Sequence, residues 1–470
     1  MGKYRCLFFV TALCILASCA KEERFSSDGF GPADQAKGFG HGYQSKVFMV
    51  PAPSGDDDTQ NLLNTIELAQ SQGPGSVVQF QKGTYNIGFI EIMEFNGTIR
   101  GAGMNKTIIK PVPELPCLEE SEKTWDVALI SFIGGNIKMS DLSFDIDDDV
   151  IPCEKQWSNI LGDMGYDLYI LVKFVDRVND HYIPKDLFVS AQLDNVSFSG
   201  GLDDGTGSAG KYNVGAGIWF GHDYTTLPAA SDVDRSNGNL TVNNCHFSDL
   251  WCGVDLPGLK SGKVIITNNI FKDIGYPLFL FDNTNTKGII SGNSFSGSIF
   301  HDLYINDMDY GVFGFYPYTP PVIKTTWKIT GNYFNTENFG GSFMNPAGVS
   351  IYMLDVRRTT YPEENMAMEF FVNNNTFNLQ KDAKGIVGLN NIGAMVVSNK
   401  FKGTGAVGIS LDGENGICSS SNKILGNNFS MADYETDIYL GPLTKNCLVA
   451  GSPMATIVNE GVGNRITGKP

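Results

Sequence analysis

A short phrase recurs along most of this chain and limits what the chain can fold into. It ends in asparagine or another small polar residue followed by a phenylalanine, as in "ITNNIF" and "VNNNTF". The closing phenylalanines are Phe144, Phe198, Phe247, Phe271, Phe295, Phe334, Phe377, Phe401 and Phe429. Phe247, Phe271 and Phe295 are 24 residues apart, as are Phe377 and Phe401. A repeat of this length, rich in glycine and without a helical period, predicts a parallel β-solenoid.

A second phrase, an apolar-x-apolar triplet after Gly or Asp, lies between these repeats, as in "GIWF", "GVDL" and "GISL". Because side chains alternate between the two faces of a strand, each triplet reads as a short strand with one outward residue. Each turn therefore holds at least two strands, and roughly ten turns fit in the chain. The predicted outward residues are Trp219, Asp255, Leu280, Tyr304, Ser350, Ser410 and Tyr439.

The repeated asparagines need a structural reason, because asparagine is unfavourable in strands and costly to bury. Asparagine tolerates a left-handed bend, and its side chain hydrogen-bonds to the backbone. We predict that Asn269, Asn293 and Asn399 occupy equivalent bends and form a ladder of amide–amide hydrogen bonds. The phenylalanines then stack in the core beside the bend.

The segment "DDDTQNLLNTIELAQ" places Leu62, Ile66 and Ala69 on one face of a helix, with Asp58 or Thr59 as the N-cap. The strand-like segments "VVQFQKGTY" and "IRGAGMNKTII" follow. This order resembles the N-terminal cap and first coils of the pectate-lyase-like superfamily. The resemblance implies an all-β fold, a right-handed single-stranded parallel β-helix with a short N-terminal capping helix, over residues 51–470.

The N-terminus reads as an export signal, because the apolar run from Leu7 to Ala17 is too short to span a bilayer. The following "LASC" resembles a bacterial lipobox and implies that Cys19 is acylated, although an ordinary signal peptide with a chance cysteine is the alternative. The next residues, "KEE", resemble the surface-export signal of Bacteroidetes lipoproteins. We therefore predict a signal peptide at 1–18, a flexible tether at 19–50, and an exported protein anchored by lipid to the outer membrane at the cell surface.

Composition bears on partners and on disulfides. The net charge of −17 argues against a nucleic-acid partner. Six cysteines remain after the signal and the lipid site, and an exported chain permits disulfides, in any of 15 pairings. Sequence proximity favours the pairs Cys117–Cys153, Cys245–Cys252 and Cys418–Cys447.

The resemblance also places a glycan groove along the sheet built from the second phrase. Its outward aromatics Trp219, Tyr304 and Tyr439 are candidate substrate-binding residues, although aromatics are also common in strands for packing reasons. Polar residues follow these strands: His222, Asp223, Asp282, Asn283, Asn306, Asp307, Asp355, Arg357, Arg358, Asn390, Asn391 and Asp412. Of these, Arg357 and Arg358 are further candidates for substrate binding.

Two chemistries are open at this groove. A hydrolase needs a pair of carboxyls, for which Asp203, Asp204 and Asp255 are candidates, with His222 nearby in the coil order. A lyase needs a base and a cation that neutralises a uronate carboxyl, which Lys211, an arginine or bound Ca²⁺ would supply.

Several features leave the chemistry undecided. Asp145, Asp147, Asp148 and Asp149 form a candidate Ca²⁺ site, although a solvated acidic loop explains them equally well. The N-T-D, R-I-K and W-x-D-H motifs of the superfamily's pectinolytic enzymes are absent, and Asp302 and Asp437 look like coil-corner residues of non-catalytic repeats. The sequence therefore predicts a surface-anchored β-helix that binds polysaccharide, with cleavage by a lyase or glycoside hydrolase left open. The alternative is a non-catalytic glycan-binding or adhesin-like solenoid.

Overall fold

The computed structural model describes residues 45–113, 128–146, 169–175, 188–201, 214–221, 236–281, 283, 285–306, 324–338, 348–355 and 367–467. They belong to one compact unit that begins at Ser45. Within these ranges the chain is almost entirely β-strand, with α1 (Thr59–Ser71) as its helix. The described part contains no helix long and apolar enough to cross a membrane.

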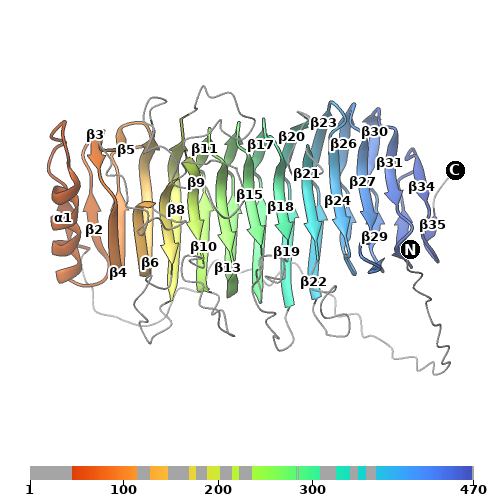
Figure 1. Ribbon diagram of the computed structural model, residues 1–470, viewed down its shortest axis with the longest axis horizontal. Coiled ribbons are helices and arrows are strands. Elements are labelled where there is room, and N and C mark those ends of the chain that lie inside the picture. Colours follow the sequence, from red (N-terminus) through yellow and green to blue (C-terminus); the bar gives the residue numbers. More distant parts are fainter. Residues whose placement is uncertain are drawn as a thin grey trace, which may run out of the picture. The chain divides into compact units, whose positions relative to one another are not determined.

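The strands stack in chain order from α1 to β35 (Figure 1) and pair in parallel as three sheets. The chain passes through sheet II, then III, then I in every coil. Parallel crossovers are almost always right-handed, and the fold is the predicted right-handed parallel β-helix. β4, β6 and β8 bend around corners and so belong to more than one sheet.

Sheet I consists of β4 (Ile90–Arg100), β6 (Ala128–Asp145), β7 (Tyr169–Val175), β9 (Val214–Phe220), β12 (Cys252–Pro257), β15 (Tyr276–Phe281), β18 (His301–Asn306), β21 (Val349–Leu354), β24 (Lys384–Leu389), β27 (Val407–Asp412), β31 (Thr436–Leu440) and β34 (Ile457–Asn459). Sheet III contains β3 (Gly83–Ile87), β5 (Thr107–Pro111), the ends of β6 and β8, β11 (His246–Ser248), β14 (Ile270–Lys272), β17 (Ser294–Ser296), β20 (Tyr333–Glu337), β23 (Thr376–Gln380), β26 (Lys400–Gly403) and β30 (Asn428–Ala432).

Sheet II contains β1 (Val47–Met49), β2 (Ser76–Gln79), parts of β4 and β6, β8 (Val189–Ser199), β10 (Ser236–Asn243), β13 (Leu259–Thr267), β16 (Thr286–Ser291), β19 (Lys324–Thr330), β22 (Ala367–Asn373), β25 (Met395–Val397), β29 (Lys423–Leu425), β33 (Leu448–Ala450) and β35 (Arg465–Thr467). A separate small sheet pairs β28 (Ser419–Ser420) with β32 (Thr444–Lys445). β1 falls inside the segment predicted as tether and pairs with β2.

Helix α1 closes the N-terminal end of the coil, as predicted. Its buried residues include Leu62, Ile66 and Ala69, the face expected from the sequence. These side chains cover apolar core that the first coil would otherwise expose to water.

The recurring phenylalanines form one continuous stack inside sheet III. Neighbouring rings from Phe144 to Phe429 lie parallel, with centroids 4.5 to 5.3 Å apart. This spacing matches the distance of about 4.8 Å between adjacent strands, so each coil contributes one ring.

The predicted asparagine ladder is confirmed at the corner between sheets II and III. The Nδ2 of Asn269 donates to Oδ1 of Asn293 at 2.9 Å, and equivalent bonds of 3.0 Å follow along the chain. The ladder residues are Asn269, Asn293, Asn332, Asn375, Asn399 and Asn427. Each Oδ1 also accepts the backbone N–H of the ladder residue one coil earlier, which satisfies these buried amides.

The left-handed bend belongs to the residue before each ladder asparagine. Asn268 has φ 57° and Asn374 φ 56°, whereas Gly292, Gly331 and Gly426 occupy the same place in other coils. In "TNNIF" the first asparagine therefore makes the turn and the second makes the ladder.

Four cysteines, Cys245, Cys252, Cys418 and Cys447, carry free thiols. Cys245 packs in the core, where its N–H donates to Asn269, whereas Cys252 packs on the outer side of sheet I. Side chains on opposite faces of the wall cannot meet, so the pair 245–252 is wrong, and so is 418–447. Cys117 and Cys153 lie outside the described residues.

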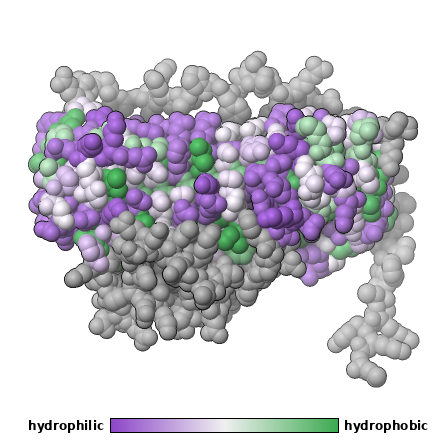
Figure 2. Space-filling model, turned by 90° about the horizontal axis from the view of Figure 1, so that it is seen from above, coloured by the Kyte–Doolittle hydropathy of each residue, from purple (hydrophilic) through white to green (hydrophobic). Residues whose placement is uncertain are grey.

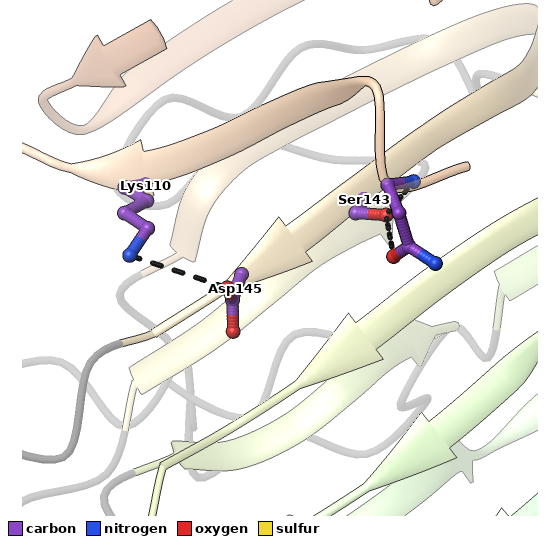
Figure 3. Close-up of polar contacts among 4 residues, drawn as sticks. Lys110, Ser143 and Asp145 are labelled. Carbon is purple, nitrogen blue, oxygen red and sulfur yellow. Dashed lines mark hydrogen bonds and ion pairs between the residues drawn. The ribbon is translucent and has the colours of Figure 1, made fainter. Parts of the chain in front are cut away.

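Polar contacts between adjacent coils also involve one predicted metal ligand. Asp145 lies 4.0 Å from the amino group of Lys110, and Ser143 bonds Asn105 beside it (Figure 3). Within the described ranges no group of three His, Cys, Asp or Glu residues is placed to hold a metal ion. Asp147, Asp148 and Asp149 fall outside those ranges.

Candidate functional site

The corners that flank sheet I contain all of the chain's long insertions between strands. Every internal range outside the described structure directly precedes or follows a strand of sheet I in the sequence. The connections from sheet II to sheet III are short and contain the asparagine ladder. Repeat proteins accumulate insertions beside the face that binds ligands, which makes the outer face of sheet I the first place to look.

One outward residue from each strand forms the central row of this face. The row runs through Glu91, Ser131, Lys173, Trp219, Asp255, Phe279, Tyr304, Tyr352, Val387, Ser410, Tyr439 and Val458. Two predicted members are wrong. Leu280 lies in the core, and Ser350 is buried against Thr336, at 2.6 Å between the hydroxyl oxygens.

The structure brings some of the predicted site residues together and not others. Trp219 and Asp255 are direct neighbours across β9 and β12. Tyr304 lies further along the same row, and Tyr439 lies beyond Val387 and Ser410, so the aromatic stripe is interrupted. The other predicted residues lie outside the described residues: Cys19, Asp203, Asp204, Lys211, His222, Arg357 and Arg358.

The N-terminal half of the face is an outer apolar layer built from Ala128, Ile133, Ile170, Val175, Ala216, Trp219, Cys252, Tyr276 and Phe300. Asp255 lies among these residues and is 9% exposed. Burial raises the pKa of its carboxyl well above the usual range, and Oδ1 has no hydrogen-bond partner. Such a carboxyl keeps its proton near neutral pH, which suits an acid rather than an ionised nucleophile.

A ladder of three aromatic rings begins where this layer ends. Phe279 stacks on Tyr304 at 5.0 Å and 15°, and Tyr304 stacks on Tyr352 at 5.2 Å and 1°. Parallel rings at this distance overlap, so neighbours cover part of each other's faces. The ladder therefore offers ring edges and hydroxyls rather than the open faces expected of a sugar-stacking platform.

The two tyrosine hydroxyls have protons free to donate. Nδ2 of Asn306 donates to the Tyr304 oxygen at 2.7 Å, which leaves the hydroxyl proton unused. The Tyr352 hydroxyl has no hydrogen-bond partner among the described residues. Burial raises the pKa of Tyr304 to about 12, and the charge of Glu414 adds to this shift. Both phenols therefore stay protonated across the physiological range.

Glu414 stands beside these hydroxyls and acts electrostatically on both tyrosines. Its backbone N–H donates to Oδ1 of Asn390 at 2.8 Å, which fixes the loop after β27. Partial burial raises the pKa of its carboxyl. We call Tyr304, Asn306, Tyr352, Asn390 and Glu414 the tyrosine–carboxylate site.

Two further acidic residues have structural roles, as expected. Asp302 is fully buried and accepts a hydrogen bond from Thr336 at 2.5 Å, and burial raises its pKa to about 7. Asp437 accepts the N–H of Thr456 at 2.7 Å. His301 is buried between Tyr276, Tyr304 and Tyr352, and burial lowers its pKa to about 3, so its ring is neutral.

Exposed apolar residues do not mark a competing surface in the view of Figure 2. The described atoms there are mostly hydrophilic, with hydrophobic residues scattered among them. Single exposed apolar side chains are normal on soluble domains.

No family model matches the sequence, and no curated protein matches it. The structure is similar to the Dettilon tailspike protein, with a TM-score of 0.51 and 12% identity over 89% of this chain and 70% of that chain. It also matches DFA-IIIase from Arthrobacter chlorophenolicus A6 (TM-score 0.49, 10% identity, 90% of this chain and 100% of that one). PfbA, a surface adhesin of Streptococcus pneumoniae, matches with a TM-score of 0.42 and 13% identity over 86% and 91% of the two chains. At such identities the likeness is one of fold, and it agrees with the parallel β-helix described above.

Proposed function

We propose that the protein is a lipid-anchored surface protein that binds a polysaccharide along the outer face of sheet I. The observation that carries the proposal is the ring ladder Phe279–Tyr304–Tyr352, with two donor hydroxyls, at the point where the outer apolar layer ends. Ring edges and oriented hydroxyls at coil spacing suit an extended ligand with many hydroxyl groups. The insertions that flank sheet I support the same face.

Removing the Tyr352 hydroxyl is expected to weaken glycan binding without weakening the fold. Tyr352→Phe deletes a donor that has no partner within the chain, so a bound sugar loses a hydrogen bond and Kd rises about tenfold. Calorimetric titration with the best ligand from a glycan panel measures this change. Tyr333→Phe, on the outer side of sheet III, is the matched control. Equal Kd values for the three proteins would rule out the tyrosine–carboxylate site as the binding surface.

Lipid anchoring has a separate test. Cys19→Ser removes the predicted acylation site, so the chain is expected to lose incorporated fatty acid and to move from the membrane fraction to the soluble fraction. Radiolabelled palmitate and cell fractionation measure the two effects. A membrane-bound Cys19→Ser protein would contradict the anchor, whatever the outcome of the glycan titrations.

Cleavage of the bound chain is a second candidate function, favoured by the protonated carboxyl of Asp255 on the same face. A glycosidase needs one carboxyl in its acid form. Incubation of the panel with the protein, followed by assays for new reducing ends and for unsaturated uronates, separates hydrolysis from elimination. Retention without product, in the wild type and in Asp255→Asn alike, would identify a non-catalytic binding solenoid.

A further inference from the structure

The described part of the tyrosine–carboxylate site carries negative charge without a compensating cation. Glu414 forms no ion pair with any described residue. Asp412 lies just before it, with its Oδ1 held by the N–H groups of Gly413 and Leu443. The basic side chain on this half of the face, Lys384, belongs to a different row, in register with Val349 and Val407.

A second anion is costly at such a place. Partial burial already raises the pKa of the Glu414 carboxyl, which means that its ionised form is poorly solvated. A ligand carboxylate or sulfate beside it would add like-charge repulsion in a region of reduced dielectric.

The site's hydrogen-bonding groups are mixed rather than all donors. Tyr304 and Tyr352 have hydroxyl protons to give. Oδ1 of Asn306 is a buried acceptor without a partner, and Nδ2 of Asn390 is a buried donor without one. A sugar hydroxyl both donates and accepts, so an uncharged sugar ring can satisfy groups that a carboxylate, which only accepts, would leave unpaired.

We propose that this site selects an uncharged, hydroxyl-rich sugar and that Glu414 excludes uronates and sulfated sugars. The proposal rests on the function proposed above and adds the chemical class of its ligand. Glu414 acts as a specificity-determining residue. It stabilises hydroxyl donors from the ligand and repels anionic substituents.

The test compares two sets of oligosaccharides on the full chain by calorimetry. One set is neutral (glucan, galactan, mannan, xylan and fructan fragments), and the other is anionic (polygalacturonate, alginate and sulfated galactan fragments). We expect the tightest ligand to be neutral, with a Kd that changes less than about twofold between roughly 50 and 500 mM salt. Glu414→Gln keeps the side chain's shape and removes its charge. It should raise the ratio of anionic to neutral affinity about tenfold or more.

Glu67→Gln, an equal change of charge on the exposed side of α1, is the matched control and should leave that ratio unchanged. An anionic glycan as tightest ligand would overturn the selectivity while leaving glycan binding in place, and so would a ratio that Glu414→Gln does not move. Absence of binding to either set would overturn the proposed function itself.

Discussion

Replacing Asn332 with alanine is expected to lower the free energy of unfolding by about 3–5 kcal/mol. The side chain of Asn332 lies in the middle of the ladder. Its Oδ1 accepts from both the N–H and the Nδ2 of Asn293, and its Nδ2 donates to Oδ1 of Asn375 and to the carbonyl of Ile290. Alanine leaves these buried partners with fewer bonds, in a place that water does not reach.

Urea unfolding followed by circular dichroism measures this loss. Asn136→Ala is the control, because Asn136 is exposed on sheet II and should change stability by less than about 0.5 kcal/mol. Because each coil contacts only its neighbours, the variant is also expected to separate the transition into two steps. Equal unfolding midpoints for the two variants would show that the ladder does not stabilise the coil.

Phe334→Ala is expected to cost about 3–5 kcal/mol, because it opens a cavity in a continuous stack. The ring of Phe334 is fully buried and lies 4.8 Å from Phe295 and 4.9 Å from Phe377. Neither neighbour can move to close the gap without leaving its own partner, so little relaxation is available.

The residue before it supplies the control. Tyr333 is on the same strand, faces outward and is 37% exposed, with the amino group of Lys402 at 5.2 Å from its ring centre. Tyr333→Ala therefore removes a similar volume but is expected to cost less than about 1 kcal/mol. A Phe334→Ala protein as stable as Tyr333→Ala would contradict the account of the core.

The sequence predicted the fold well because one buried polar residue and one aromatic ring recur in each coil. Asn269 and Phe271 carry this signal, since neither an inward asparagine nor a stacked ring is tolerated outside a repeating neighbourhood. What the sequence did not separate was the work of Asn268 from that of Asn269. The turn and the ladder use the same residue type for different properties, backbone tolerance in one and side-chain bonding in the other.

The site was predicted less completely, because strands of sheet I are apolar on both faces. In "YPLFLF" Leu278 and Leu280 face the core while Phe279 faces outward, and no alternation of polarity distinguishes them. Tyr352 was missed for the same reason. Glu414 was missed because it lies two residues beyond its strand, at a place that only the hydrogen bond to Asn390 defines.

The ladder has a consequence for how a protein of this kind changes in length. Asn268 and Gly292 make the same bend, and Asn269 and Asn293 make the same bonds one coil apart. Deleting residues 269–292 would join Asn268 to Asn293 and leave every remaining amide opposite its partner. Loss or gain of any other number of residues at this corner would break the ladder. The length of the outer face of sheet I is therefore quantised, and it grows or shrinks in steps of one strand, about 4.8 Å each.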